Sequence, residues 1–210
     1  MKVTKWQHAL LQIEQAGAQL IVDPGFYSEL PATQNVVAIT LSHVHDDHSY
    51  RDHVEELVRR HPGALLFGTE EVRDKLSSLN VQPVYHGDRH QVGPFILDFY
   101  GDLHQEIHRS IPIVQNFGLM VNQELYYPGD SYTIPEVRVP TLACPSIAPW
   151  LKISDVMDFV EAVRPQRAFP THNALLSDVG HQLYNSRIQE LVEKHGGQFR
   201  FLTPGESWEI

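Results

Sequence analysis

The three imidazoles of His43, His45 and His48 and the carboxylate of Asp47 fall within six residues, in the stretch His43-Val44-His45-Asp46-Asp47-His48. The stretch follows an apolar, β-branched run at 36–41 and precedes a helix-like segment. Because side chains alternate along an extended chain, His43 and His45 should point the same way. The turn into the helix can then bring Asp47 and His48 to a second position. This donor set suits Zn²⁺, with Mn²⁺ and Fe²⁺ as the other candidates. A solvated, histidine-rich loop is the alternative interpretation.

The spacing His-x-His-x-Asp-His resembles the metal-binding motif of the metallo-β-lactamase superfamily. Further segments match elements of that family, in the expected order, over nearly the whole chain. They are Asp23 after an early strand, Gly101-Asp102-Leu103-His104, Tyr127-Pro128-Gly129-Asp130-Ser131 and Phe169-Pro170-Thr171-His172-Asn173. The resemblance implies a layered α/β fold of four layers, αββα, in which two mixed sheets pack face to face with helices outside.

The resemblance also implies a ligand set for two divalent cations. The first ion is expected to bind His43, His45 and His104, the second to bind Asp47, His48 and His172, and Asp130 to be shared. The third histidine of the first ion is open, because His104 and His108 are only four residues apart. We prefer His104, which follows closely on an expected strand end.

Such a pair of cations, about 3.5–4 Å apart, would share a water, lower its pKa and aim it at an electrophilic carbonyl or phosphorus. We expect Asp47 to orient this nucleophile and Asp130 to hold the two ions together. His108 is the candidate for assisting the leaving group or contacting substrate, and a surface histidine is its alternative interpretation. The sequence therefore predicts a hydrolase that cleaves a small ester-type substrate, a lactone or a phosphodiester.

Weaker signals resemble the ascorbate-phosphate lactonase-like subgroup of the family. They are His8 in the first hairpin, the stretch 101–112, Asn116-Phe117-Gly118 and Ala148-Pro149-Trp150. A lactone of a phosphorylated sugar acid would combine both substrate classes. The sequence assigns no role to His8 or Trp150.

Other classes of this fold fit less well. Diiron redox members are expected to carry Glu in place of His45 and to append a flavin domain. The best-known secreted β-lactamases have cysteine where this chain has Asp130. Glyoxalase-II-like thioesterases need a further helical domain. A metal-dependent nuclease and a non-catalytic metal-binding protein remain the alternatives, since fold alone does not establish activity.

Length and composition set the remaining expectations. The chain has 210 residues and a net charge of −10, which suits one domain over 1–210 and argues against nucleic acid as a partner. A small, anionic substrate is still compatible, and Arg109 and Lys152 are candidate contacts for it, or else solvated surface charges. The lone Cys144 is expected in the core. One cysteine, no signal-like start and no long apolar run predict a cytoplasmic protein without membrane contact. The oligomeric state is not predicted.

The expected elements alternate in two comparable halves. A hairpin is predicted in the first 25 residues, from strand-like composition at 3–13, a turn at 15–17 and a strand at 19–22. Further strands are predicted at 36–41, 64–67, 81–85, 95–100, 119–121, 124–127, 141–144 and 167–169, and a closing hairpin at 199–202 and 207–210. Helices are predicted at 52–60, 70–79, 153–163 and 182–195.

Overall fold

Two seven-stranded mixed sheets form the centre of the computed structural model, which describes all of residues 1–210. The first sheet has the strand order β14-β1-β2-β3-β4-β5-β6. Its strands are β1 (Lys2–Lys5), β2 (Leu11–Gln15), β3 (Ala18–Val22), β4 (Val36–Leu41), β5 (Leu65–Gly68), β6 (Val81–Pro83) and β14 (Glu206–Glu209).

The second sheet has the order β13-β12-β11-β10-β9-β8-β7. Its strands are β7 (Arg89–Val92), β8 (Phe95–Tyr100), β9 (Gly118–Val121), β10 (Leu125–Tyr127), β11 (Thr141–Pro145), β12 (Arg167–Thr171) and β13 (Gln198–Phe199). In each sheet one part is antiparallel and the other parallel: β3 to β6 run parallel in the first sheet and β10 to β13 in the second.

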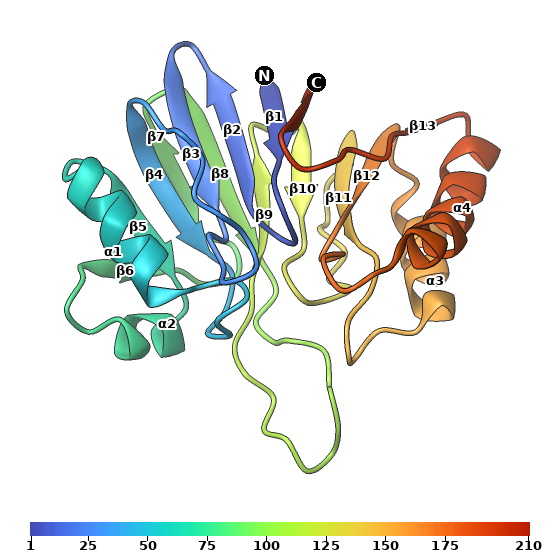
Figure 1. Ribbon diagram of the computed structural model, residues 1–210, viewed down its shortest axis with the longest axis horizontal. Coiled ribbons are helices and arrows are strands. Elements are labelled where there is room, and N and C mark those ends of the chain that lie inside the picture. Colours follow the sequence, from blue (N-terminus) through green and yellow to red (C-terminus); the bar gives the residue numbers. More distant parts are fainter.

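Helices cover the outer face of each sheet, so the fold has the four predicted αββα layers (Figure 1). Helices α1 (Arg51–Arg60) and α2 (Glu70–Lys75) lie on the first sheet, and α3 (Ile153–Val163) and α4 (Asp178–Lys194) on the second. Three apolar cores separate the layers: one between the sheets and one beneath each helix pair. Cys144 is buried in the core beneath α3 and α4, as expected for a small apolar side chain. None of the helices has the length and apolarity needed to cross a bilayer.

This layered arrangement positions the predicted site residues. Parallel strands present their carboxyl ends at one edge of a sheet, where loops are free to carry polar side chains. Asp23 follows β3, the His-rich segment follows β4, Asp130 follows β10 and His172 follows β12. The two sheets therefore bring these segments to the same end of the sandwich.

Several predicted elements need correction at the chain ends. The strand-like run 3–13 is two antiparallel strands, β1 and β2, joined by a loop in which His8 has φ 58°. The predicted closing hairpin is wrong: β13 pairs with β12 in the second sheet, whereas β14 pairs with β1 in the first. The local sequence pattern indicates that a segment forms a strand, but it does not indicate which strand it pairs with, because long-range packing selects that partner.

The interior differs in smaller ways. Strand β7 was not predicted, because the polar sequence Arg89-His90-Gln91-Val92 forms a half-exposed edge strand without an apolar signal. Helix α2 ends at Lys75, four residues earlier than predicted. Helix α4 begins at Asp178, four residues earlier than predicted, where Ser177 caps it by accepting a hydrogen bond from the amide of Gly180.

Candidate metal centre

Six imidazoles and two carboxylates meet at the carboxyl ends of the strands. They come from five separate segments: His8; His43, His45, Asp47 and His48; His104; Asp130; and His172. Their side chains form three groups in which potential ligand atoms lie within 4.8 Å of one another: His43, His45 and His104; His43, His48 and Asp130; and His8, Asp47, His48 and His172. The structure thus brings together all seven residues of the predicted ligand set and adds His8.

Unpaired polar atoms line the centre of this cluster. The buried atoms without a hydrogen-bond partner include Nε2 of His43, His48, His104 and His172, and Oδ1 of Asp130. Nε2 of His172 lies 3.0 Å from Oδ2 of Asp130, but the angles are not those of a hydrogen bond. Each such atom costs about 1–3 kcal/mol when it is left unpaired. Bound divalent cations would satisfy these atoms, so the residues present fit a metal site.

The other ring nitrogens fix the orientation of these imidazoles. Nδ1 of His104 donates to the carbonyl oxygen of Gln105, and Nδ1 of His172 donates to that of Ile147, both at 2.5 Å. Because a carbonyl only accepts, Nδ1 carries a proton in both charge states, so the neutral imidazole has its free lone pair on Nε2. This is the tautomer that a metal ligand needs.

Asp23 holds His48, a predicted ligand of the second ion, in place. Its carboxylate accepts from Nδ1 of His48 at 2.7 Å, from the amide and hydroxyl of Ser42 at 2.7 and 2.5 Å, and from the hydroxyl of Tyr127 at 2.8 Å. Since Tyr127 lies on β10, this fully buried carboxylate ties the two sheets together beside the site.

Asp130 is fixed from both ends. Nε1 of Trp150 donates to its Oδ2 at 2.9 Å, and its amide donates to Oδ1 of Asn116 at 2.9 Å. The preceding Gly129 has φ +61°, and a Cβ there would lie 2.3 Å from Oδ1 of Asn116. The glycine therefore lets this loop approach Asn116 closely. The structure gives Trp150 the role that the sequence did not: it positions the central carboxylate.

His8 is the functional residue that the ligand prediction missed. Its Nε2 lies 3.2 Å from Oδ2 of Asp47, and its ring centroid lies 3.9 Å from that of His172. Its Nδ1 accepts from the amide of Ala174 at 3.4 Å, so Nε2 carries the proton and donates to Asp47. The carbonyl of His8 also accepts from the amide of His172 at 2.9 Å. Its positive φ has no sequence signal, since His8 stands in a strand-like run.

Electrostatics prepare the carboxylates to be anions. Burial raises the pKa of Asp130, but the imidazoles of His172 and His48 outweigh it and hold that pKa well below its usual value. The pKa of Asp47 is lowered in the same way, by His48, His172 and His8 against the effect of burial. Burial lowers the pKa of His172, but the neighbouring carboxylates, chiefly Asp130, outweigh this effect and raise that pKa to about 10. The metal-free cluster thus holds protons where a cation would bind.

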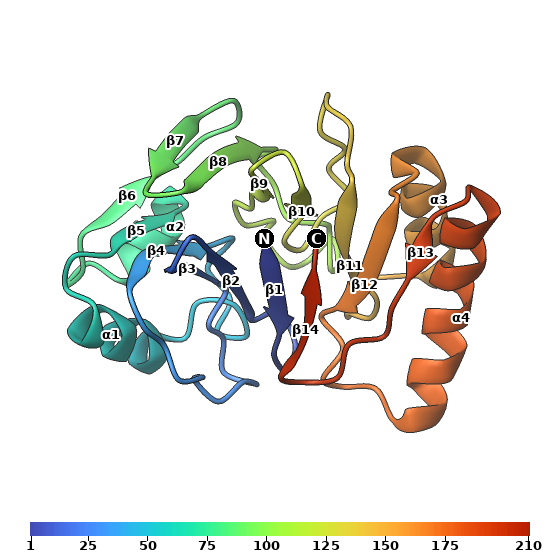
Figure 2. The same cartoon turned by 90° about the horizontal axis from the view of Figure 1, so that it is seen from above.

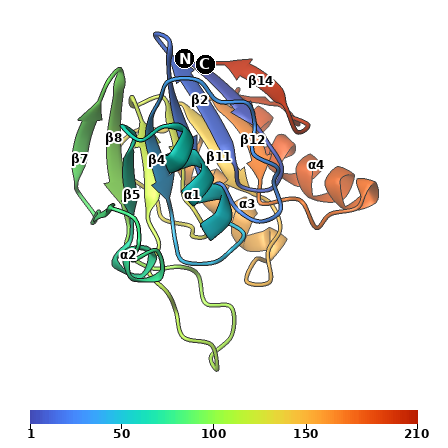
Figure 3. The ribbon, with the colours of Figure 1, turned by 60° about the vertical axis from the view of Figure 1, so that its left-hand side comes forward.

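His108, Arg109 and Lys152 lie outside the cluster. His108 and Arg109 are exposed on the long loop between β8 and β9, which extends beyond the ends of both sheets (Figures 1 and 3). Nδ1 of His108 is paired with the hydroxyl of Ser110 at 2.7 Å. Of the two histidines left open by the sequence, the structure brings His104, and not His108, to His43 and His45.

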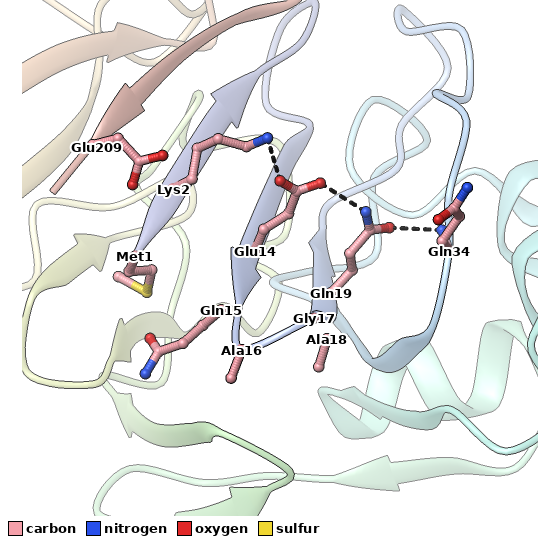
Figure 4. Close-up of a pocket in the computed structure, with 10 residues that line it drawn as sticks. All are labelled: Met1, Lys2, Glu14, Gln15, Ala16, Gly17, Ala18, Gln19, Gln34 and Glu209. Atoms are coloured by element: carbon pink, nitrogen blue, oxygen red, sulfur yellow. Dashed lines mark hydrogen bonds and ion pairs between the residues drawn. The ribbon is translucent and has the colours of Figure 1, made fainter.

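A separate hollow lies at the opposite end of β3 from Asp23 (Figure 4). It has a volume of about 490 Å³ and is lined by both chain ends and the β2–β3 turn. Its polar side chains pair with one another: Lys2 with Glu14, Glu14 with Gln19, and Gln19 with the amide of Gln34. These contacts engage Lys2, Glu14 and Gln19 with neighbouring groups.

Comparison with known proteins supports the architecture. The family model described as a beta-lactamase superfamily domain matches residues 2–172. The chain belongs to the metallo-β-lactamase superfamily. Rv0786c of Mycobacterium tuberculosis is 30% identical over 198 residues, which cover 91% of this chain and 93% of that protein.

Solved structures share the fold at low identity. Igni18, described as a novel metallo hydrolase of the archaeon Ignicoccus hospitalis, aligns with a TM-score of 0.74 and 19% identity over 100% of this chain and 98% of its own. CmlA, described as a diiron β-hydroxylase of Streptomyces venezuelae, aligns with a TM-score of 0.70 and 14% identity over 100% of this chain and 54% of its own. Since these two proteins differ in activity, the fold alone does not select a reaction.

Proposed function

We propose that this protein is a hydrolase that uses two divalent cations, most simply Zn²⁺, to cleave a small ester-type substrate. The observation that carries the proposal is the set of buried, unpaired Nε2 atoms around Asp130. Oδ2 of Asp130 lies 3.3 Å from Nε2 of His104 and 3.0 Å from that of His172, which belong to different ligand groups. A carboxylate in this position can serve two ions.

The proposed assignment follows the groups. One ion would be held by His43, His45 and His104, the other by Asp47, His48 and His172, and both by Asp130. Bound there, the ions would supply an acidified water and stabilise negative charge developing on the substrate. Every other contribution comes from the chain itself.

The opening toward substrate lies at His45 and Asp47. These two side chains are half-buried, whereas the other proposed ligands are buried. Asp47 is therefore placed to orient a water that enters from solvent by accepting its hydrogen bond. The donated hydrogen bond from His8 fixes Oδ2 of Asp47 and leaves its other oxygen free for that task.

A lactone or a phosphodiester remains the proposed substrate class, in a cytoplasmic protein. The nuclease alternative is weaker because a net charge of −10 opposes association with a polyanion. A non-catalytic metal-binding role is the other alternative. Nothing in the ligand cluster favours it, since each proposed ligand is present.

The test combines metal analysis with a substrate screen. Protein purified without chelator and reconstituted with Zn²⁺ or Mn²⁺ is expected to hold two ions per chain and to hydrolyse a lactone or a phosphodiester. Thioesters and neutral carboxylic esters complete the screen. A metal ratio that never exceeds one would refute the two-ion site. Two bound ions without turnover of any substrate would favour the non-catalytic alternative.

A further inference from the structure

A buried lysine without an ionic partner lies beside the metal centre. Lys5, the last residue of β1, is 2% exposed. Its ammonium group makes one hydrogen bond, to Oδ1 of Asn173 at 2.7 Å, and no ion pair. Buried lysines are rare unless a carboxylate or another acceptor compensates the charge. Two of its three N–H donors are left for something else.

The ammonium group borders a cavity of about 180 Å³. The cavity lies between the end of β1, the residues after β12, the start of α4 and the segment that joins β13 to β14 (Figure 2). Its polar lining includes Lys5, His8, Asn173 and His181, and no carboxylate. Because a water molecule occupies about 30 Å³ in the liquid, the space admits a group of several heavy atoms.

Two further polar groups of this lining are unpaired. Asn173 is 2% exposed, and its Nδ2 has no partner because Oδ1 faces Lys5. Nδ1 of His181 is also buried without a partner. An ammonium group, an amide nitrogen and an imidazole nitrogen can all donate hydrogen bonds. A cavity that offers donors, one positive charge and no carboxylate is complementary to an oxyanion.

We propose that this cavity binds a small oxyanion, a carboxylate or phosphate group, through Lys5, Asn173 and His181. The oxyanion is either the charged end of the substrate or a free anion, and only the first source rests on the proposed function. His8 links the two places, since it lines the cavity and also donates to Asp47. Burial lowers the pKa of Lys5 to about 8, which still leaves the group mainly protonated at neutral pH.

The site is tested without reference to activity by NMR of zinc-loaded protein with ¹³Cε-labelled lysine. Lys5→Met identifies the Lys5 resonance. We expect acetate and inorganic phosphate, added at constant ionic strength, to shift that resonance saturably. Lys2 lies on the same strand, is more exposed and pairs with Glu14, so its resonance serves as the internal control. A Lys5 resonance that neither anion moves would overturn the proposal.

Asn173→Asp gives a second, independent check. The substitution places a carboxylate against Lys5, which should occupy the ammonium group and abolish the shift. An unchanged anion response in this variant would also overturn the proposal.

The source of the anion is separated by kinetics on a hydrolysed ester. If the substrate supplies the oxyanion, Lys5→Met should raise KM about tenfold for an anionic ester relative to its neutral analogue, the loss of one charge-assisted hydrogen bond. If KM is unaffected while the Lys5 resonance still shifts in wild type, the ligand is a free anion. If no ester is hydrolysed, the proposed function fails and the NMR result still decides whether the site exists.

Discussion

At the scale of single residues, Asp130 is the side chain on which the two ligand groups converge. Its buried carboxylate is surrounded by imidazoles on one side and held by the indole of Trp150 on the other. Substitution of Asp130 should therefore reduce metal binding and activity more than substitution of Trp150 does.

Asp130→Ala is expected to reduce bound metal below two ions per chain and to remove turnover, because no other carboxylate reaches both groups. Trp150→Phe keeps the aromatic packing and loses only the donated hydrogen bond, so it should cost roughly 10–100-fold in metal affinity or activity. Metal analysis and kcat on both variants measure the difference. Near-normal turnover in Asp130→Ala would refute the assignment.

The choice between His104 and His108 gives a direct contrast. His104 is buried with an unpaired Nε2, whereas His108 is exposed and paired with Ser110. The His104→Ala variant should lose the first ion, whereas the His108→Ala variant should retain both ions. Titration with a zinc chelator ranks the two affinities, and the reverse order would move the ligand to His108.

The coupled imidazoles predict a pH optimum for the stability of metal-free protein. His172 holds its proton up to pH about 10, above its usual 6.5. The folded state thus binds more protons than the unfolded chain above pH 6.5, so stability falls as pH rises. Below that pH the effect reverses, because burial lowers the pKa of His8 to about 4 and the unfolded chain binds more protons.

We therefore expect the stability of the metal-free protein to peak near pH 6.5 and to fall toward pH 8, above which the lowered pKa of Lys5 begins to oppose the fall. Saturating Zn²⁺ should remove the fall, since the cation replaces the proton on His172. Urea unfolding with and without metal tests this. Stability that increases from pH 6.5 to 8 without metal would contradict it.

The residues that the structure brings together in the candidate site were largely predictable because they cluster in sequence or follow strand ends. His43, His45, Asp47 and His48 needed only one turn to converge. His8 and Trp150 were noticed but had no assignable role, since their contacts join segments at least twenty residues apart. Lys5 gave no signal at all, because its burial depends on elements from the far end of the chain.

At the scale of elements, the turn between β4 and α1 depends on a second loop that packs against it. Gly25 lies in the loop after β3, and a Cβ there would be 1.7 Å from the carbonyl oxygen of Asp47. The same loop donates a hydrogen bond to the turn between β4 and α1, from the amide of Phe26 to the carbonyl of Asp46.

Gly25→Ala should therefore displace Asp47 and His48 and weaken the second ion more than the first. A matched control is Gly63→Ala, where an added Cβ meets nothing within 4 Å. Stepwise zinc titration followed by thermal unfolding distinguishes loss of one ion from general destabilisation. Equal zinc binding by the two variants would show that the loop tolerates the change.

Elements with strong periodicity were predicted closely, and those defined by distant partners were not. The helix at 153–163 and the strands at 36–41 and 95–100 match the structure to the residue. Strands β13 and β14 were expected to pair with each other, yet each joins a different sheet. The apolar pattern of a sequence indicates which residues are buried, but it does not indicate which other element they pack against.

At the scale of the whole molecule, the chain that contains the candidate metal centre has a net charge of −10. Arg109 and Lys152 are both exposed and form no ion pair, so their influence on a substrate is long-range and weak. They are the candidates for attracting an anionic substrate against the overall charge.

Arg109→Ala and Lys152→Ala are each expected to narrow the preference for a phosphorylated substrate over its dephosphorylated analogue by a small factor, and added salt should narrow it in wild type too. The measurement is kcat/KM for both substrates at two ionic strengths. If neither substitution changes the ratio, these side chains are only solvated surface charges.

The pairing of β1 with β14 places the two chain ends side by side, with the amino group of Met1 donating to the carbonyl of Ile210 (Figure 1). During synthesis, β1 leaves the ribosome long before its neighbour β14, because the two strands lie some two hundred residues apart in the chain. Until then, β1 is an open sheet edge, available to other chains. Contacts of such sequence separation also form slowly. Completion of the first sheet must therefore wait until β14 has been synthesised, which leaves β1 of the nascent chain exposed to aggregation for the whole of that interval.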